Sequence, residues 1–124
     1  MKRFLAILLF AMIICQVAYA AEPTWQYVTT QNNVSYHVDM NRITINKNIL
    51  NFWLLVDRKT QQQTVKAHVT ADLEQKIYRF DEAYITDTAS DQTAHMVTPT
   101  PWEKITPASP IEKTIQFIMT RHNE

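Results

Sequence analysis

The chain has 124 residues, with twelve Lys and Arg against twelve Asp and Glu, one cysteine and no glycine. A formally neutral chain lacks the basic surplus typical of nucleic-acid binding, and a chain without glycine cannot form the glycine-rich loops that cradle nucleotide phosphates. The length is that of a single domain.

The first twenty residues have the three zones of a secretory signal. Lys2 and Arg3 give a positive start, and residues 4–15 are all apolar. Ala18-Tyr19-Ala20 then provides a small-x-small cleavage site. Because the apolar run is shorter than the ~20 residues that a stable membrane span needs, a cleaved signal peptide at residues 1–20 is favoured over a membrane tether.

Cys15 ends this apolar run and raises the alternative of a lipid anchor. Lipidation requires a small residue directly before the cysteine, whereas Ile14 is bulky. We therefore expect an exported chain that starts at Ala21, with no lipid and no membrane span. That form contains no cysteine, which excludes disulfides and thiolate metal sites. Its net charge is about −2, because two basic residues leave with the signal.

Two asparagine-containing turns each separate two strand-like segments in the first half of the domain. Without glycine, turns that need positive φ should fall to Asn or Asp. The first turn is Asn32-Asn33, and the second is Asn46-Lys47-Asn48. Both arrangements predict β-hairpins. The segments that they join are residues 25–30 with 34–39, and residues 43–45 with 49–57.

Residues 65–73 alternate strictly between apolar and polar side chains, which indicates a strand with one buried face. Residues 77–86 are the next expected strand, residues 87–93 a polar turn, and residues 95–98 a short strand. Four prolines between residues 98 and 110 predict an extended connection that does not pair in a sheet.

The C-terminal segment predicts a helix from Pro110 to about Arg121. Ser109, Pro110 and Glu112 form a capping box, with the serine as N-cap, the proline at the first helical position and the glutamate at the third. Apolar side chains then recur at helical spacing and form one stripe, which we expect to pack on the sheet. They are Ile111, Ile115, Ile118 and Met119.

Together these elements predict an α+β fold in which a single antiparallel sheet of about five to six strands carries the C-terminal helix on one face. Residues 52–56 are apolar on both faces of their strand, so this strand should be central. Its second face also needs a cover. The domain's own loops are favoured for that role over a homodimer or another partner.

A further set of positions combines aromatic strand residues, aspartates at strand ends and a closing Trp-x-x-Ile-x-Pro-x-Ser run before the helix. They are Trp25, Tyr27, Tyr36, Asp39, Trp53, Asp57, Arg79, Trp102, Pro107, Ser109 and Glu112. In this order they resemble the surface-adhesin protein E family of small Gram-negative envelope proteins, over residues 21–124. The resemblance implies a secreted protein without a cofactor that contributes to adhesion by engaging host extracellular-matrix or serum proteins.

Members of that family carry two cysteines joined as a disulfide, and this chain departs from them at both positions. By the resemblance, Leu73 stands at the first position and Met119 at the second, or Ile118 with a shift of one residue. We expect an apolar contact between Leu73 and Met119 in place of the bridge.

The sequence predicts no catalytic, cofactor or metal site, and we expect that the protein is not an enzyme. The histidines at 37, 68, 95 and 122 are scattered along the chain. Asp72 and Glu74 could flank a cation or a substrate, but a solvated strand face is favoured. Asp81-Glu82 is interpreted as surface charge rather than as an acid/base pair. Trp25, Trp53 and Trp102 are interpreted as core or staple aromatics, with an exposed recognition anchor as the alternative.

Two functions remain open on these grounds. The first is an adhesin-like envelope protein that binds a host protein at the cell surface. The second is a periplasmic accessory or inhibitor protein that binds another envelope protein. Neither involves nucleic acid.

Overall fold

The computed structural model describes residues 22–122. The predicted signal peptide, with Cys15 and the cleavage before Ala21, lies outside the described residues and stays a prediction. Among the described helices, none has both the length and the apolar character needed to cross a membrane.

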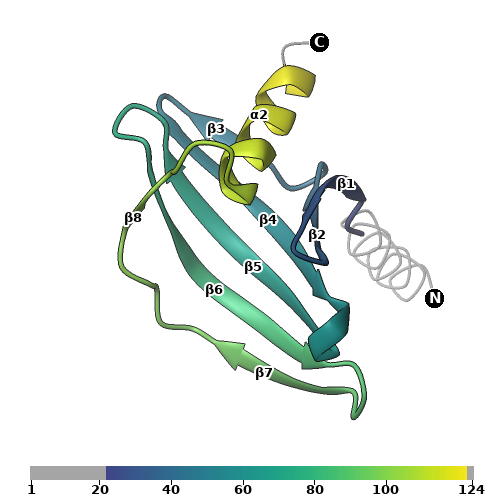
Figure 1. The fold of residues 1–124 in the computed structure, drawn as a ribbon. Helices are drawn as coiled ribbons and strands as arrows, with labels where there is room; N and C mark the ends of the chain where they lie inside the picture. The colour runs from purple at the N-terminus through teal and green to yellow at the C-terminus, as the bar shows by residue number, and fades with distance from the viewer. Residues whose placement is uncertain (1–21, 123–124) are drawn as a thin grey trace, which may run out of the picture.

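The described residues form one antiparallel sheet of eight strands and a C-terminal α-helix, which confirms the α+β class (Figure 1). The main strand order is β1-β2-β4-β5-β6-β7, with β3 paired to β4 and β8 paired to β6. A 3-10 turn, η1 (Lys59–Gln61), joins β4 to β5, and the helix is α2 (Pro110–His122). The strands are β1 (Trp25–Gln31), β2 (Val34–Asp39), β3 (Thr44–Asn46), β4 (Ile49–Arg58), β5 (Gln63–Asp72), β6 (Ile77–Asp87), β7 (Gln92–Met96) and β8 (Glu103–Lys104).

The predicted count of five to six strands was too low, and the proline-rich connection explains part of the error. Residues 103 and 104 pair with Tyr78 and Ile77, because this short stretch contains no proline and can still join a ladder. The short strand expected at 95–98 lies instead at 92–96. Every residue of this strand is exposed, as expected at the edge of a sheet. The Thr86 and Thr93 hydroxyls lie 2.9 Å apart between the two paired strands.

Both predicted hairpins are present, but their turns do not rely on asparagine alone. Asn32 and Asn33 take positive φ as expected, at 54° and 63°. In the second hairpin the positive φ falls on Lys47 rather than on an asparagine. The expectation that only Asn or Asp would take positive φ was therefore wrong at four positions. A residue with a Cβ atom pays about 1–2 kcal/mol for this left-handed conformation, and strand pairing or helix capping offsets that cost. These positions are Lys47, Gln62, Lys76 and Ala108.

The helix begins at the predicted residue and with the predicted cap. The Glu112 N–H donates to Ser109 Oγ over 3.2 Å, and Glu112 Oε1 accepts from the Ala108 N–H over 2.9 Å. The return bond therefore goes to the residue before the N-cap and not to the N-cap itself. Two backbone donors at the helix start are satisfied by these side chains.

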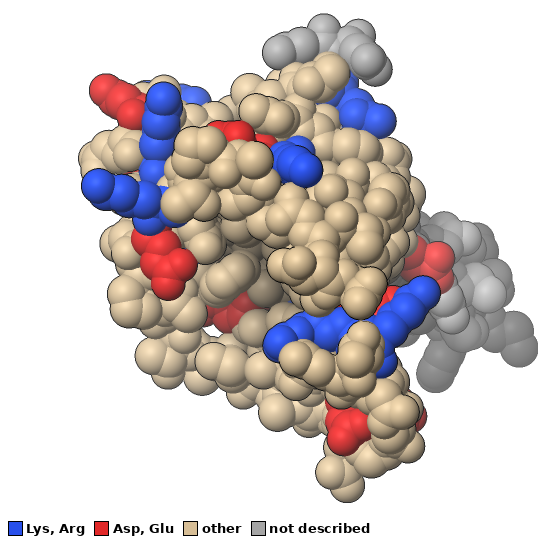
Figure 2. All heavy atoms as spheres, in the orientation of Figure 1, with Lys and Arg blue, Asp and Glu red and all other residues tan. Residues whose placement is uncertain are grey.

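Helix α2 covers one end of a single sheet face and leaves the rest of that face without a helix (Figure 1). Seen from the helix side, the surface is hollowed beside α2, and most atoms around the hollow belong to neither basic nor acidic residues (Figure 2). The opposite sheet face has no helix over it in the described part of the chain. The fold thus offers two different surfaces. One is the apolar, hollowed surface beside α2, and the other is the sheet face opposite α2.

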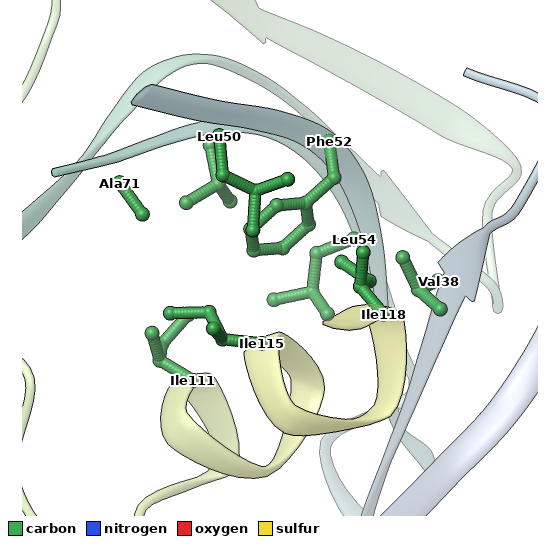
Figure 3. Packing of buried hydrophobic residues seen from close by; sticks show 9 residues of the cluster. Val38, Leu50, Phe52, Leu54, Ala71, Ile111, Ile115 and Ile118 are labelled. Carbon is green, nitrogen blue, oxygen red and sulfur yellow. The ribbon is translucent and has the colours of Figure 1, made fainter. Parts of the chain in front are cut away.

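The hydrophobic core lies between the apolar stripe of α2 and strands β2, β4 and β5 (Figure 3). Ile118 faces the central strand β4, in which Phe52 and Leu54 are buried, so the predicted central position of this strand is confirmed. Leu73 and Met119 both pack against this core from its border, while a direct contact between them stays a prediction.

Candidate binding face

The sheet face opposite α2, called the open face below, carries one continuous row of side chains across the six main strands. The register makes each member the cross-strand neighbour of the next. Successive side chains in a strand point to opposite faces, so this row alternates with the buried residues below the helix. In strand order the row is Tyr27, His37, Leu55, Lys66, Tyr84 and His95.

Four rings gather on the open face around Tyr84. The Tyr84 and His95 rings stack with centroids 4.1 Å apart and planes 5° from parallel. Trp53 is stacked against Tyr84 at 6.3 Å and tilted against His68 at 5.2 Å. We call Trp53, His68, Tyr84 and His95 the aromatic cluster. Aromatic pairs add about 0.5–1.5 kcal/mol beyond the area that they bury.

A loop of the domain covers the aromatic cluster only in part. The Arg42 guanidinium, from the connection between β2 and β3, lies 5.0 Å from the Trp53 ring centroid. Trp53 is half-buried, whereas Tyr84 is 38% exposed and Tyr27 is 56% exposed. The domain's own loops therefore shield the tryptophan and leave much of the face to solvent.

A β-bulge in β6 places two successive carboxylates on the open face. His68 pairs with Glu82 and Val69 with Phe80, so Asp81 is the extra residue. Strict alternation would send Asp81 to the helix side, but the bulge turns it outward beside Glu82. Both carboxylates are partly exposed, and each is paired with a histidine of the aromatic cluster.

Each carboxylate holds one ring of the aromatic cluster. His68 Nδ1 lies 2.9 Å from Asp81 Oδ2, and His95 Nε2 lies 2.8 Å from Glu82 Oε2. The Thr70 hydroxyl also donates to Asp81. The two imidazole rings are thereby fixed on either side of Tyr84 before any partner arrives, which lowers the entropy cost of binding.

Arg79 extends this network beyond the edge of the sheet. Its Nε donates to Asp81 Oδ1 over 3.0 Å, and its guanidinium lies 4.7 Å from the centroid of Trp102. Trp102 belongs to the proline-rich connection and is 44% exposed. Its interpretation as a core residue was therefore wrong, because the connection follows the edge of β6 and leaves much of the indole exposed beside Arg79. Trp25 and Trp53 are half-buried.

Asp39 anchors the other side of the open face. This side chain is completely buried and accepts hydrogen bonds from the Thr24 N–H (2.9 Å), the Asn41 N–H (3.0 Å) and Arg42 Nε. Burial alone would raise the pKa of Asp39, but the bonds from Arg42 and from the two backbone donors outweigh it, and the pKa is lowered. Asp39 thus positions the guanidinium that covers Trp53.

The other predicted positions divide between the open face and purely structural places. Tyr27, Trp53, Arg79 and Trp102 contribute to the open face, and Asp39 acts on it through Arg42. Asp57 is half-buried at the end of β4, opposite Ser35 and Thr64. Positions that serve the helix side or its start are Tyr36, Pro107, Ser109 and Glu112.

Asp72 and Glu74, which could have flanked a cation, instead stabilise the turn between β5 and β6. Asp72 Oδ1 accepts the N–H groups of Glu74 and Gln75, and Glu74 accepts a bond from the Asn48 side chain. Within residues 22–122 no three His, Cys, Asp or Glu side chains lie together as a metal site would require.

The residues that sequence reasoning missed are His68, Tyr84, His95, Asp81, Glu82 and Arg42. The alternation of residues 65–73 did place His68 on the polar face, but nothing in the sequence showed that it meets His95. Comparisons with protein-family models, with curated proteins and with solved structures found no match to this chain.

Proposed function

We propose that the protein is an exported envelope protein that binds a host extracellular-matrix or serum protein through the open face of its sheet. The observation that carries the binding part is the aromatic cluster, fixed by two histidine–carboxylate pairs and left open to solvent around Tyr84. Tyr, Trp and Arg are the residues that most often dominate protein–protein binding energies.

The size of the open face suits a protein partner. Six strands at about 4.8 Å spacing give a width of about 24 Å, and a strand of the length of β4 spans about 34 Å. These dimensions match a patch of about 800 Å², which is what one partner contributes to a standard interface. Tyr27 near one edge and Trp102 at the other are exposed at the ends of this patch.

The adhesin part of the proposal draws on the export signal and on the family resemblance. An adhesin must reach the cell surface, so protease treatment of intact cells should degrade it while leaving a periplasmic marker intact. Resistance of the protein under these conditions would contradict the adhesin role and favour a partner inside the envelope.

Solid-phase binding to a panel of immobilised matrix and serum proteins tests the same proposal. We expect saturable binding to at least one member, and we expect Trp102→Ala to weaken it tenfold or more, as loss of an aromatic hot spot does. Gln116→Ala is the matched control, because Gln116 is exposed on α2 and far from the open face in the fold. Equal binding by both variants would refute the use of this face.

A further inference from the structure

A cavity of about 500 Å³ opens on the helix side of the sheet, next to the first turn of α2. It lies in the region of the hollow seen beside the helix in Figure 2. Strands β4, β5 and β6 form its floor, with Val65 and Ile85 among its members. Ile111 of the helix and Met96 of β7 stand on its sides. Its volume falls within the ~300–1,000 Å³ typical of small-ligand sites.

The lining of this cavity is almost entirely apolar, and its one charged residue is Arg58. No aspartate or glutamate lines it. Arg58 ends β4, where its Nη1 donates to Gln63 Oε1 over 3.1 Å. It makes no ion pair with a carboxylate anywhere in residues 22–122. Since a guanidinium has five N–H donors, most of its donors remain for a ligand.

The cavity runs along the strands away from this cation. Arg58 and Leu54 both line it and are four residues apart on β4, which corresponds to about 13 Å. Four lining residues carry a hydroxyl, namely Tyr36, Tyr78, Thr100 and Ser109. Three of these hydroxyls are already engaged, because Thr100 Oγ1 accepts from the Phe80 N–H, Ser109 Oγ caps the helix and the Tyr78 hydroxyl donates to Glu103. A peptide backbone in this cavity would leave polar groups without partners, whereas an alkyl chain needs none.

We propose that this cavity binds a single-chain amphiphile with an anionic head, and specifically a medium-chain carboxylic acid. The carboxylate accepts hydrogen bonds from the Arg58 guanidinium, whose planar fork fits a carboxylate with two parallel bonds. The alkyl chain lies on the apolar floor formed by β4, β5 and β6. The site is on the opposite side of the sheet from the open face, so it is independent of the proposed protein partner.

Isothermal titration of the full chain with decanoate, dodecanoate and decanol, below their aggregation thresholds, tests the proposal. We expect one molecule bound per chain. Dodecanoate should bind about fifteenfold more tightly than decanoate, since each of its two additional buried methylenes contributes about 0.8 kcal/mol. Decanol should bind at least tenfold more weakly than decanoate, because it lacks the charge that Arg58 recognises.

Two variants locate the head and the chain separately. Arg58→Gln should weaken decanoate binding tenfold or more and bring the affinity for decanoate down to that for decanol. Lys113→Gln, which removes a charge on the exposed side of α2, should leave the affinities for decanoate and decanol unchanged. Val65→Phe should abolish binding by filling the floor, and Val97→Phe, at an exposed position outside the lining, should not. Thermal melts followed by circular dichroism confirm that each variant is folded.

Several results would overturn the proposal. Equal affinity for decanol and decanoate, or an unchanged affinity in Arg58→Gln, would show that the cation does not recognise the ligand. More than one molecule bound per chain would indicate partition onto apolar surface. Absence of binding at millimolar decanoate, together with a dimer in sedimentation, would assign the cavity to a second copy. The matrix-protein assay tests variants on the open face and not in this cavity. The two proposals can therefore be refuted independently.

Discussion

Replacement of Asp39 is the sharpest test of how the open face is held together. Its carboxylate is completely buried and accepts two backbone N–H groups and the Arg42 guanidinium. Asp39→Ala removes all three acceptor contacts at once. Asp39→Asn keeps Oδ1 for the two backbone donors, but it removes the charge and replaces Oδ2, the acceptor of the Arg42 bond, with an N–H donor.

The expected cost of Asp39→Ala is about 3 kcal/mol in the free energy of unfolding. Each partly buried N–H left without an acceptor costs about 1–3 kcal/mol. The Arg42 contribution is taken at the low end, because that side chain is 41% exposed and its charge is screened by solvent. Asp39→Asn should cost about 1 kcal/mol, because the solvent-screened Arg42 interaction is lost while the bonds from Thr24 and Asn41 persist.

The cost should also depend on pH. Hydrogen bonds lower the pKa of Asp39 in the folded protein below the ordinary value of 3.8. A group whose folded pKa is lowered contributes stability above its unfolded pKa and loses it as pH falls through the folded pKa. The difference between wild type and Asp39→Asn should therefore be complete at pH 6 and shrink below pH 4.

Urea unfolding followed by tryptophan fluorescence at pH 7, 5 and 3.5 measures these differences. Asp57→Asn is the control, because Asp57 is half-buried on the same sheet but makes no side-chain hydrogen bond among residues 22–122. A cost below 0.5 kcal/mol for Asp39→Ala, or a difference that grows as pH falls, would refute the assigned role of this carboxylate.

Three further predictions concern the helix side of the fold. Ser109→Ala should lower the free energy of unfolding by about 1 kcal/mol through loss of the N-cap, measured in urea against Thr120→Ala on the exposed helix surface. Burial and the carboxylate that accepts its hydroxyl raise the pKa of Tyr78 to about 12. The unfolded tyrosine ionises near pH 10, so stability should fall between pH 10 and 12, and less so in Tyr78→Phe. If the family resemblance holds, the double variant Leu73→Cys, Met119→Cys should form a disulfide on oxidation, detected as a loss of two mass units; free thiols would contradict it.

The parts of the fold that follow from local sequence were predictable. The helix start depends on Ser109 and Glu112, which are three residues apart, and both bonds of that cap lie within a few residues. The first hairpin likewise depends on Asn32 and Asn33, which supply positive φ where a two-residue turn requires it. Local chemistry of this kind can be read directly from the chain.

The open face was not predictable, because it depends on strand register and on one irregularity. Tyr84 and His95 meet only because β6 and β7 pair in this register. Asp81 reaches the same face only through the bulge, which breaks the alternation on which sequence reasoning relies. Trp102 was misassigned because aromatic residues are usually buried, and nothing local showed that its connection leaves the indole exposed at the edge of β6.

The central claim is that the protein binds its partner through the aromatic cluster on the open face. The most direct test is the affinity of Tyr84→Ala for a matrix or serum protein that the wild type binds, compared with Gln116→Ala on α2. We predict that Tyr84→Ala binds at least tenfold more weakly, with a melting temperature close to that of the wild type, and that Gln116→Ala binds normally. Wild-type affinity in a folded Tyr84→Ala variant would contradict the claim.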